Sequence, residues 1–280
     1  MVSITTQRLT DEIKRQQKLS ENITNLVTQI STGTKINKAS DDPQAWVQIS
    51  EIGRAQAQQS NWSANADYAQ SRYATADSAM DELSTLLVRA RELVISASSP
   101  ARASSQSSIA AELDGVRESI NQLLSQKDAS GLPVFDSGQP VRIPVANGYN
   151  IEAVPTVESL TQGISVGGAP QTLDNILSNA VAAINSGDST ALTSSLDAVN
   201  SAGDHIATAR TLHGIRGDRI DKVIETLETN GMQTEERRMA LQDTDLATAI
   251  AQVQANLLSL QAAQTTYTKI SQQSLFDLIR

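Results

Sequence analysis

The sequence predicts a mainly α-helical protein made of long, antiparallel, coiled-coil-like helical rods built from both termini, with a small β-containing insert at the tip. Three observations predict this fold class. Long helical patterns occupy both ends of the chain, aromatic residues make up only 3% of its 280 residues, and Gly and Pro accumulate in residues 133–170. A composition dominated by Ala, Ser, Thr and Gln suits thin helical pairs better than a thick globular core.

The order of these patterns predicts three parts, two of them discontinuous in the sequence. Residues 1–40 with 241–280 form a terminal helical coiled-coil domain, which we expect to be the assembly core. Residues 41–132 with 171–240 form a helical rod domain, and residues 133–170 form a small outer insert that bears a β-hairpin. A chain folded about its middle in this way brings its two ends together.

The last stretch, residues 243–280, contains neither Gly nor Pro. Its apolar residues follow steps of three and four that place them on one stripe of a helix. An unbroken helix of this length would exceed roughly 50 Å. Such a rod cannot bury its stripe against itself, so it needs a second long helix from the same chain or from a neighbouring one. The stripe is formed by Leu246, Ile250, Val253, Leu257, Leu260 and Tyr267.

The first stretch predicts a matching helix over residues 3–31, with Gly33 as its C-terminal stop. Its apolar stripe slips in register between Ile13 and Leu19. A peripheral amphipathic helix of an ordinary domain would show the same periodicity. The match between the two ends of the chain favours paired rods instead. The stripe comprises Leu9, Ile13, Leu19, Ile23, Leu26 and Ile30.

A pair of carboxylates, Asp41 and Asp42, precedes Pro43 at the start of the next helical pattern. Asp42 is expected to cap the exposed amides of that helix, and Pro43 to take its first position. A metal or acid–base site is the alternative, but neither a His nor a third carboxylate is nearby. The helix is expected to end near residues 98–100, where Ser98-Ser99-Pro100 stops it.

The middle of the chain predicts shorter elements. A helix over residues 109–123 is followed by the insert, in which Val141, Ile143 and Val145 alternate as in a strand and Asn147-Gly148 offers a hairpin turn. Helical pattern resumes near residue 172. It breaks at residues 187–188, and a further interruption is expected at residues 230–231, where Asn is followed by Gly.

The sequence contains no recognisable catalytic, cofactor or metal site, so the chain is not expected to be an enzyme. His205 and His213 are far in sequence from any dense carboxylate group and are expected on helix surfaces. The net charge of −9 with dispersed Lys and Arg argues against nucleic acid as a partner. The absence of a long apolar run argues against membrane insertion, and no cleavable secretory signal is visible.

Three segments carry a resemblance to a known family. QISTGTKINKASDDPQAW at residues 29–46 and the stretch at residues 241–280 look like the two terminal signatures of the bacterial flagellin superfamily, and residues 90–124 resemble its core helices. The resemblance implies a structural subunit of the bacterial flagellum without catalytic activity or cofactor. Ser40-Asp41-Asp42-Pro43 favours a subunit that joins hook to filament, whereas Arg280 and the small insert favour a flagellin that forms the filament itself.

The resemblance also implies where the chain works and with what. Its terminal helices would pack with copies of itself in a helical tube, next to other hook-associated proteins and flagellin. The location would be extracellular, in the flagellum. Export would use the flagellar type III apparatus, without a cleaved signal peptide, after a cytoplasmic chaperone has guarded the C-terminal segment.

The apolar stripes suggest how assembly and folding are linked. They bury too little within one monomer to offset an ordering cost of about 1–2 kcal/mol per residue. We therefore expect the ends to become helical only when neighbouring subunits complete the seam. A soluble helical sensor or adaptor that docks on one partner is the alternative. The expected assembly seam comprises Leu9, Ile13, Ile23, Leu26, Ile30, Leu246, Ile250, Val253, Leu257, Leu260, Tyr267, Leu275 and Phe276.

Overall fold

The computed structural model describes residues 2–99 and 105–278, and within them the side chains of residues 7, 10–99 and 105–269. The chain divides into two compact units. One combines the two ends of the sequence, and the other is the continuous middle segment. We call residues 1–57 with 231–280 the terminal unit, and residues 58–230 the central unit. The three-part division expected from the sequence remains a prediction.

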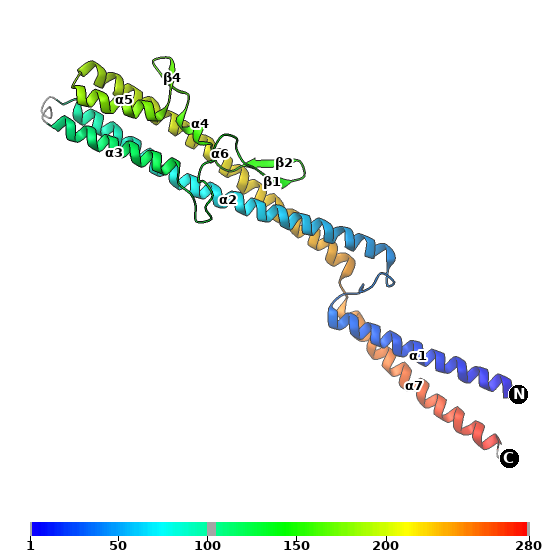
Figure 1. Cartoon of the computed structure of the whole chain (residues 1–280). Coiled ribbons are helices and arrows are strands. Elements are labelled where there is room, and N and C mark those ends of the chain that lie inside the picture. Colours follow the sequence, from blue (N-terminus) through cyan, green and yellow to red (C-terminus); the bar gives the residue numbers. More distant parts are fainter. Residues whose placement is uncertain (1, 100–104, 279–280) are drawn as a thin grey trace. The chain divides into compact units, whose positions relative to one another are not determined.

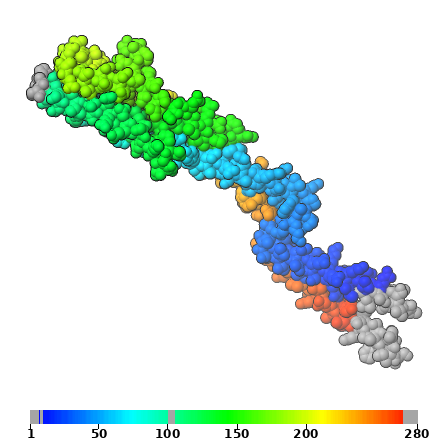
Figure 2. Space-filling model, viewed as in Figure 1, coloured from blue at the N-terminus to red at the C-terminus, as the bar shows by residue number. Residues whose placement is uncertain are grey.

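The terminal unit is built on two long helices from opposite ends of the chain. Helix α1 (Val2–Thr32) and helix α7 (Leu246–Leu278) pack against each other. They run antiparallel, and they lie side by side as blue and orange-to-red segments in Figures 1 and 2. Because neither end could bury its stripe alone, this pairing provides the partner that the sequence pattern requires. The predicted fold class, with long rods formed by both termini, is confirmed.

The central unit joins most of two long helices to several shorter ones. These are helix α2 (Pro43–Ala97), which precedes the insert in the sequence, and helix α6 (Ser189–Gln242), which follows it. Helix α3 (Gln106–Leu124) packs on helix α5 (Leu173–Ser186) (Figure 1). One hydrophobic cluster runs through all of them, and fully buried members include Met80, Leu113, Ile120, Ile176 and Ile206. The main hydrophobic core therefore lies in this unit.

The insert contains two hairpins, of which the sequence predicted one. Strands β1 (Arg142–Ala146) and β2 (Tyr149–Glu152) form the predicted hairpin about Asn147-Gly148, with Gly148 at φ 74°. After the short helix α4 (Val157–Thr161), strands β3 (Ile164–Val166) and β4 (Ala169–Gln171) form a second hairpin. That hairpin was missed because each strand has only three residues, too few to show alternation.

A buried ion pair ties the insert to helix α2. Arg72 Nη2 lies 3.0 Å from Asp136 Oδ1, and the two side chains are only 7% and 2% exposed. Asp136 Oδ2 also accepts a hydrogen bond from the backbone amide of Val141 at 2.7 Å, and Arg72 donates to the carbonyl of Pro133 at 3.0 Å. The start of the insert is thus fixed by charged groups that have left water, where each must keep its partner.

Helix α6 corrects one expectation about breaks. The pattern does stop at Gly187, which takes a left-handed φ of 68° after helix α5. However, helix α6 runs through Asn230 and Gly231 without interruption. An interior Gly costs a helix about 1 kcal/mol, and the long helical segments on both sides outweigh that cost.

His213 corrects another expectation, because its side chain is fully buried rather than on a helix surface. Its ring stacks on Tyr73 with centroids 4.3 Å apart. Nε2 is 3.2 Å from the carbonyl oxygen of Tyr73, and Nδ1 has no hydrogen-bond partner among the described residues. His205 lies on the flank of α6, where Nε2 is 3.0 Å from the carbonyl oxygen of Ser159.

Burial of His213 makes the central unit sensitive to mild acid. Desolvation lowers the pKa of His213 below its usual 6.5, so the unfolded chain binds the proton more readily than the folded one. The part of the free energy of unfolding that depends on neutral His213 is therefore fully present above about pH 6.5. It falls as the pH drops from there toward the folded pKa, by at most about 1.4 kcal/mol per pH unit. We expect urea unfolding between pH 7.5 and 5.5 to show this slope in wild type and in His205→Gln, and His213→Phe to abolish it. An unchanged slope in His213→Phe would contradict the assignment.

Close packing beside the same stack predicts opposite effects for two neighbouring glycines of α6. A Cβ added at Gly217 would lie 2.5 Å from Cζ of Tyr73, whereas one added at Gly214 meets nothing within 4 Å. We expect Gly217→Ala to lower the free energy of unfolding by about 1–3 kcal/mol. Gly214→Ala should raise it by about 0.5–1 kcal/mol, since Ala restricts the unfolded chain. Thermal unfolding of both variants tests this, and equal effects would show that the Tyr73 contact is not tight.

Candidate assembly interface

A short backbone clasp joins the inner ends of the two terminal helices. Gly33, at φ 72°, ends helix α1. Thr34 and Asp243 then pair as an antiparallel bridge, flanked by two hydrogen bonds: the Lys35 amide donates to the Gln242 carbonyl at 2.7 Å, and the Thr244 amide donates to the Gly33 carbonyl at 3.0 Å. The clasp fixes where α1 and α7 begin to run together.

Aspartates occupy the starts of the helices that leave this clasp. Asp42 Oδ1 accepts from the amides of Gln44 and Ala45 at 3.0 Å, and Pro43 is the first residue of α2. Asp245 Oδ1 accepts from the amides of Ala247 and Thr248 at the start of α7. Its carboxylate also accepts from the Thr248 hydroxyl, and these hydrogen bonds lower the pKa of Asp245. Both carboxylates thus satisfy amides at a helix start.

One row of each terminal helix faces its partner; we call these rows the inner seam. On both helices the less exposed residues repeat at steps of three and four, as in a coiled coil. Ala249 is the best covered, at 4% exposure. The seam contains polar residues as well as apolar ones, so it is weak. It comprises Glu12, Gln16, Leu19, Ile23, Leu26 and Ile30 of α1, and Ala249, Val253, Asn256, Leu260, Ala263 and Tyr267 of α7.

A second apolar row on α7, which we call the outer stripe, stays exposed within the described chain. It comprises Leu246, Ile250, Leu257 and Leu258, whose exposed fractions are 48%, 46%, 43% and 70%. At about 100° per residue, the first three lie directly beside Val253 and Leu260 of the inner seam. The two rows therefore form one broad apolar arc, and helix α1 covers only one flank of it.

The predicted seam residues consequently fall into four groups. Val253, Leu260, Tyr267, Ile23, Leu26 and Ile30 lie in the inner seam, and Leu246, Ile250 and Leu257 lie in the outer stripe. Ile13 is 44% exposed, because the less exposed positions of α1 before Leu19 are Glu12 and Gln16. The side chains of Leu9, Leu275 and Phe276 lie outside the described residues. Sequence reasoning missed Ala249 and Ala263, whose small side chains give little periodic signal.

The described residues offer little for other kinds of site. No cluster of three or more His, Asp or Glu side chains among them is placed to hold a metal ion. None of the helices, over its described length, combines the span and the apolar content needed to cross a bilayer.

The described chain thus combines paired terminal helices that carry a half-covered apolar arc with a helical central unit that bears a small β insert. Residues 4–139 match the bacterial flagellin N-terminal helical region. The resemblance to the flagellin superfamily seen in the sequence is therefore confirmed.

The chain is also similar to flagellar hook-associated protein 3. It is 27% identical over 128 residues to that protein of Salmonella typhimurium, covering 45% of this chain and 37% of the relative. It is 28% identical over 142 residues to the Escherichia coli protein, covering 50% and 41%. The chain thus spans about two fifths of the length of the curated relatives it matches.

Solved structures share the fold. A hook-associated protein from Vibrio parahaemolyticus superposes with a TM-score of 0.65 at 17% identity, covering 72% of this chain and 99% of that structure. The hook-associated protein 3 of Legionella pneumophila superposes with a TM-score of 0.61 at 12% identity, covering 69% and 98%. At these identities the likeness concerns the fold alone.

Proposed function

We propose that this chain is a structural subunit of the bacterial flagellum that joins the hook to the filament by helical self-assembly through α1 and α7. The outer stripe carries the proposal, because it leaves three large apolar side chains of one helix nearly half exposed, and Leu258 more so, beside a covered seam. Exposed apolar rows of this kind mark interaction sites. The similarity to hook-associated protein 3 supports the junction in particular.

The energetics favour many weak contacts over one strong contact. Burying each half-exposed Leu or Ile contributes about 1 kcal/mol. One such interface would hold two copies loosely. A helical tube repeats the contact for every subunit, and each added copy covers the stripe of its neighbour while offering its own. An adaptor with a single partner would gain the contact only once.

The same stripe gives a reason for a chaperone before assembly. In the cytoplasm, an uncovered apolar row on α7 would promote premature association. We infer that an export chaperone covers the C-terminal segment and that the flagellar type III apparatus exports the chain to the cell exterior without cleaving a signal peptide. Other hook-associated proteins and flagellin are the proposed neighbours, and the role requires neither catalysis nor a cofactor.

Folding of the terminal helices is expected to depend on assembly. Because the inner seam contains Gln16 and Asn256 at core places, the α1–α7 pair alone offsets little of its ordering cost. In hydrogen exchange of the monomer we expect residues 1–35 and 245–280 to be almost unprotected, while the central unit is protected. In assembled protein the same ends should become protected. Strong protection of both ends in the monomer would contradict coupled folding.

A second candidate function is a flagellin that forms the filament itself. The match of residues 4–139 to the flagellin N-terminal region favours it. Expression in two motility mutants separates the candidates. The junction role predicts restored filament attachment in a strain without hook-associated protein 3 and no filament in a strain without flagellin. The filament role predicts the reverse, and failure in both strains would contradict both.

A further inference from the structure

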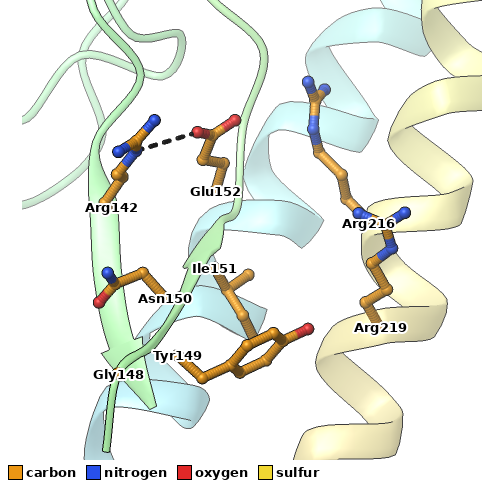
Figure 3. A pocket seen from close by; sticks show the side chains of 8 residues that line it. All are labelled: Arg142, Gly148, Tyr149, Asn150, Ile151, Glu152, Arg216 and Arg219. Atoms are coloured by element: carbon orange, nitrogen blue, oxygen red, sulfur yellow. Dashed lines mark hydrogen bonds and ion pairs between the residues drawn. The ribbon is translucent and has the colours of Figure 1, made fainter. Parts of the chain in front are cut away.

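A cleft of about 420 Å³ opens in the central unit between the β1–β2 hairpin and helix α6 (Figure 3). Ligand sites of folded proteins typically begin at about 300 Å³, so the cleft has room for a compact molecule. The polar side chains that line it are Arg142, Tyr149, Asn150 and Glu152 from the hairpin, and Arg216 and Arg219 from α6.

The hairpin side of the cleft is held in place from beneath. Ile143 and Ile151 are paired across the two strands, and each is only 5% exposed. The side-chain amide of Asn65, on α2, donates to the carbonyl of Pro144 at 2.7 Å. Since these contacts fix the strands, a ligand would not have to order them, and a pre-formed site costs less to occupy.

The cleft holds more positive than negative charge. Arg142 Nε lies 3.3 Å from Glu152 Oε1, and this pair balances itself. Arg216 and Arg219 have no ion-pair partner among the described residues. In a chain whose net charge is −9, this is a local excess of two unpaired guanidinium groups. It attracts an anion from solution.

Helix geometry keeps the acidic residues of α6 away from these arginines. Arg216 and Arg219 are three residues apart and share one flank. Asp218 and Asp221 fall on the opposite flank, at about 100° per residue. There they face Tyr73, whose pKa is raised by burial first, then by Asp77 and by these two carboxylates. The two guanidinium groups therefore have no counter-charge on their own helix, and a bound carboxylate would supply one.

The remaining lining groups define the chemistry of the ligand. Figure 3 shows the Tyr149 ring leaning from the hairpin with its hydroxyl toward α6, and the Arg216 side chain extending from α6 toward the hairpin. A guanidinium fork binds a carboxylate through two hydrogen bonds. Tyr149, 46% exposed, offers an apolar ring face and a hydroxyl, and the Asn150 amide can both donate and accept.

We propose that this cleft binds an acidic sugar, a hydroxyl-bearing ring that carries a carboxylate. Arg216 and Arg219 take the carboxylate, the Tyr149 ring stacks on the sugar face, and Asn150 bonds its hydroxyl groups. All of these residues lie in the central unit. The inference therefore does not rest on assembly of the terminal helices, and it can be tested on the soluble chain whether or not that chain polymerises.

Calorimetric titration of the full chain at low ionic strength tests the proposal, with glucuronate as probe and glucose as its uncharged counterpart. We expect glucuronate to bind and glucose not to bind. Arg216→Gln/Arg219→Gln should weaken glucuronate binding about tenfold or more, and Tyr149→Ala should weaken it as well. Arg54→Gln/Arg237→Gln removes the same charge from exposed positions outside the cleft and should leave binding unchanged.

Three results would overturn the proposal. The first is no binding of glucuronate at millimolar concentration to a chain whose thermal unfolding is normal. The second is equal weakening by the two double variants, which would indicate attraction by net charge alone. The third is binding of inorganic phosphate or of a poly-glutamate peptide as tight as that of glucuronate, together with no effect of Tyr149→Ala, which would indicate a general anion site.

Discussion

Leu257→Asp is expected to abolish incorporation of the chain into a polymer while leaving its central unit folded. Leu257 is 43% exposed in the outer stripe, so the substitution costs the isolated chain little. In an assembly it would place an unpaired carboxylate against apolar side chains and would lose the Leu contact. The combined cost of about 4 kcal/mol corresponds to roughly a thousandfold higher critical concentration. Sedimentation and electron microscopy of concentrated protein measure it.

Leu212→Asp is the matched control for this experiment. Leu212 is also an exposed Leu on a long helix, at 53%, but it lies in the central unit. It should leave assembly within a few fold of wild type. Circular dichroism should show the same thermal transition of the central unit in both variants. Normal assembly of Leu257→Asp would contradict the role of the outer stripe. An equal loss of assembly in Leu212→Asp would show that the effect is not specific to the outer stripe.

Of the stability variants proposed for the central unit, Asp136→Ala is expected to lower the free energy of unfolding the most. The substitution leaves the Arg72 guanidinium buried without its counter-ion and the Val141 amide without its acceptor. Breaking a buried pair from one side costs about 3–5 kcal/mol. Urea unfolding followed by circular dichroism measures the loss.

Two further variants sharpen that test. Asp81→Ala breaks a pair with Arg210 in which both side chains are well exposed, so it should cost less than about 1 kcal/mol. Arg72→Met/Asp136→Leu removes both buried charges together and should recover part of the stability that Asp136→Ala loses. Equal, small losses in Asp136→Ala and Asp81→Ala would contradict the anchoring role of the buried pair.

Much of the helical framework could be predicted from the sequence because the signals are local. The stop at Gly33, the start at Pro43, the break at Gly187 and the turn at Asn147-Gly148 each depend on backbone preferences of one or two residues. The pairing of the two ends followed from matched stripes that could not be buried alone. These features are set by a few neighbouring residues, so they are readable without the structure.

The remaining features depend on contacts between distant segments. Periodicity placed Val253 and Leu257 on one stripe of α7, but it could not show that α1 covers the first and leaves the second exposed. The burial of His213 depends on Tyr73, which is 140 residues away. Arg216 and Arg219 likewise line a cleft only because a hairpin far from them in sequence lies beside α6. No local pattern encodes these distances.

The clasp at Thr34 and Asp243 also determines the rotational phase between the chain ends. Each residue added or removed between the bridge and either helix would turn that helix by about 100° about its own axis. Because the bare row lies to one side of the covered row, either an insertion or a deletion of one residue, but not both, would turn the bare row inward and the covered row outward, without altering one side chain. Loop length at this point is thus as strict a determinant of which surface the molecule shows as any apolar residue on it.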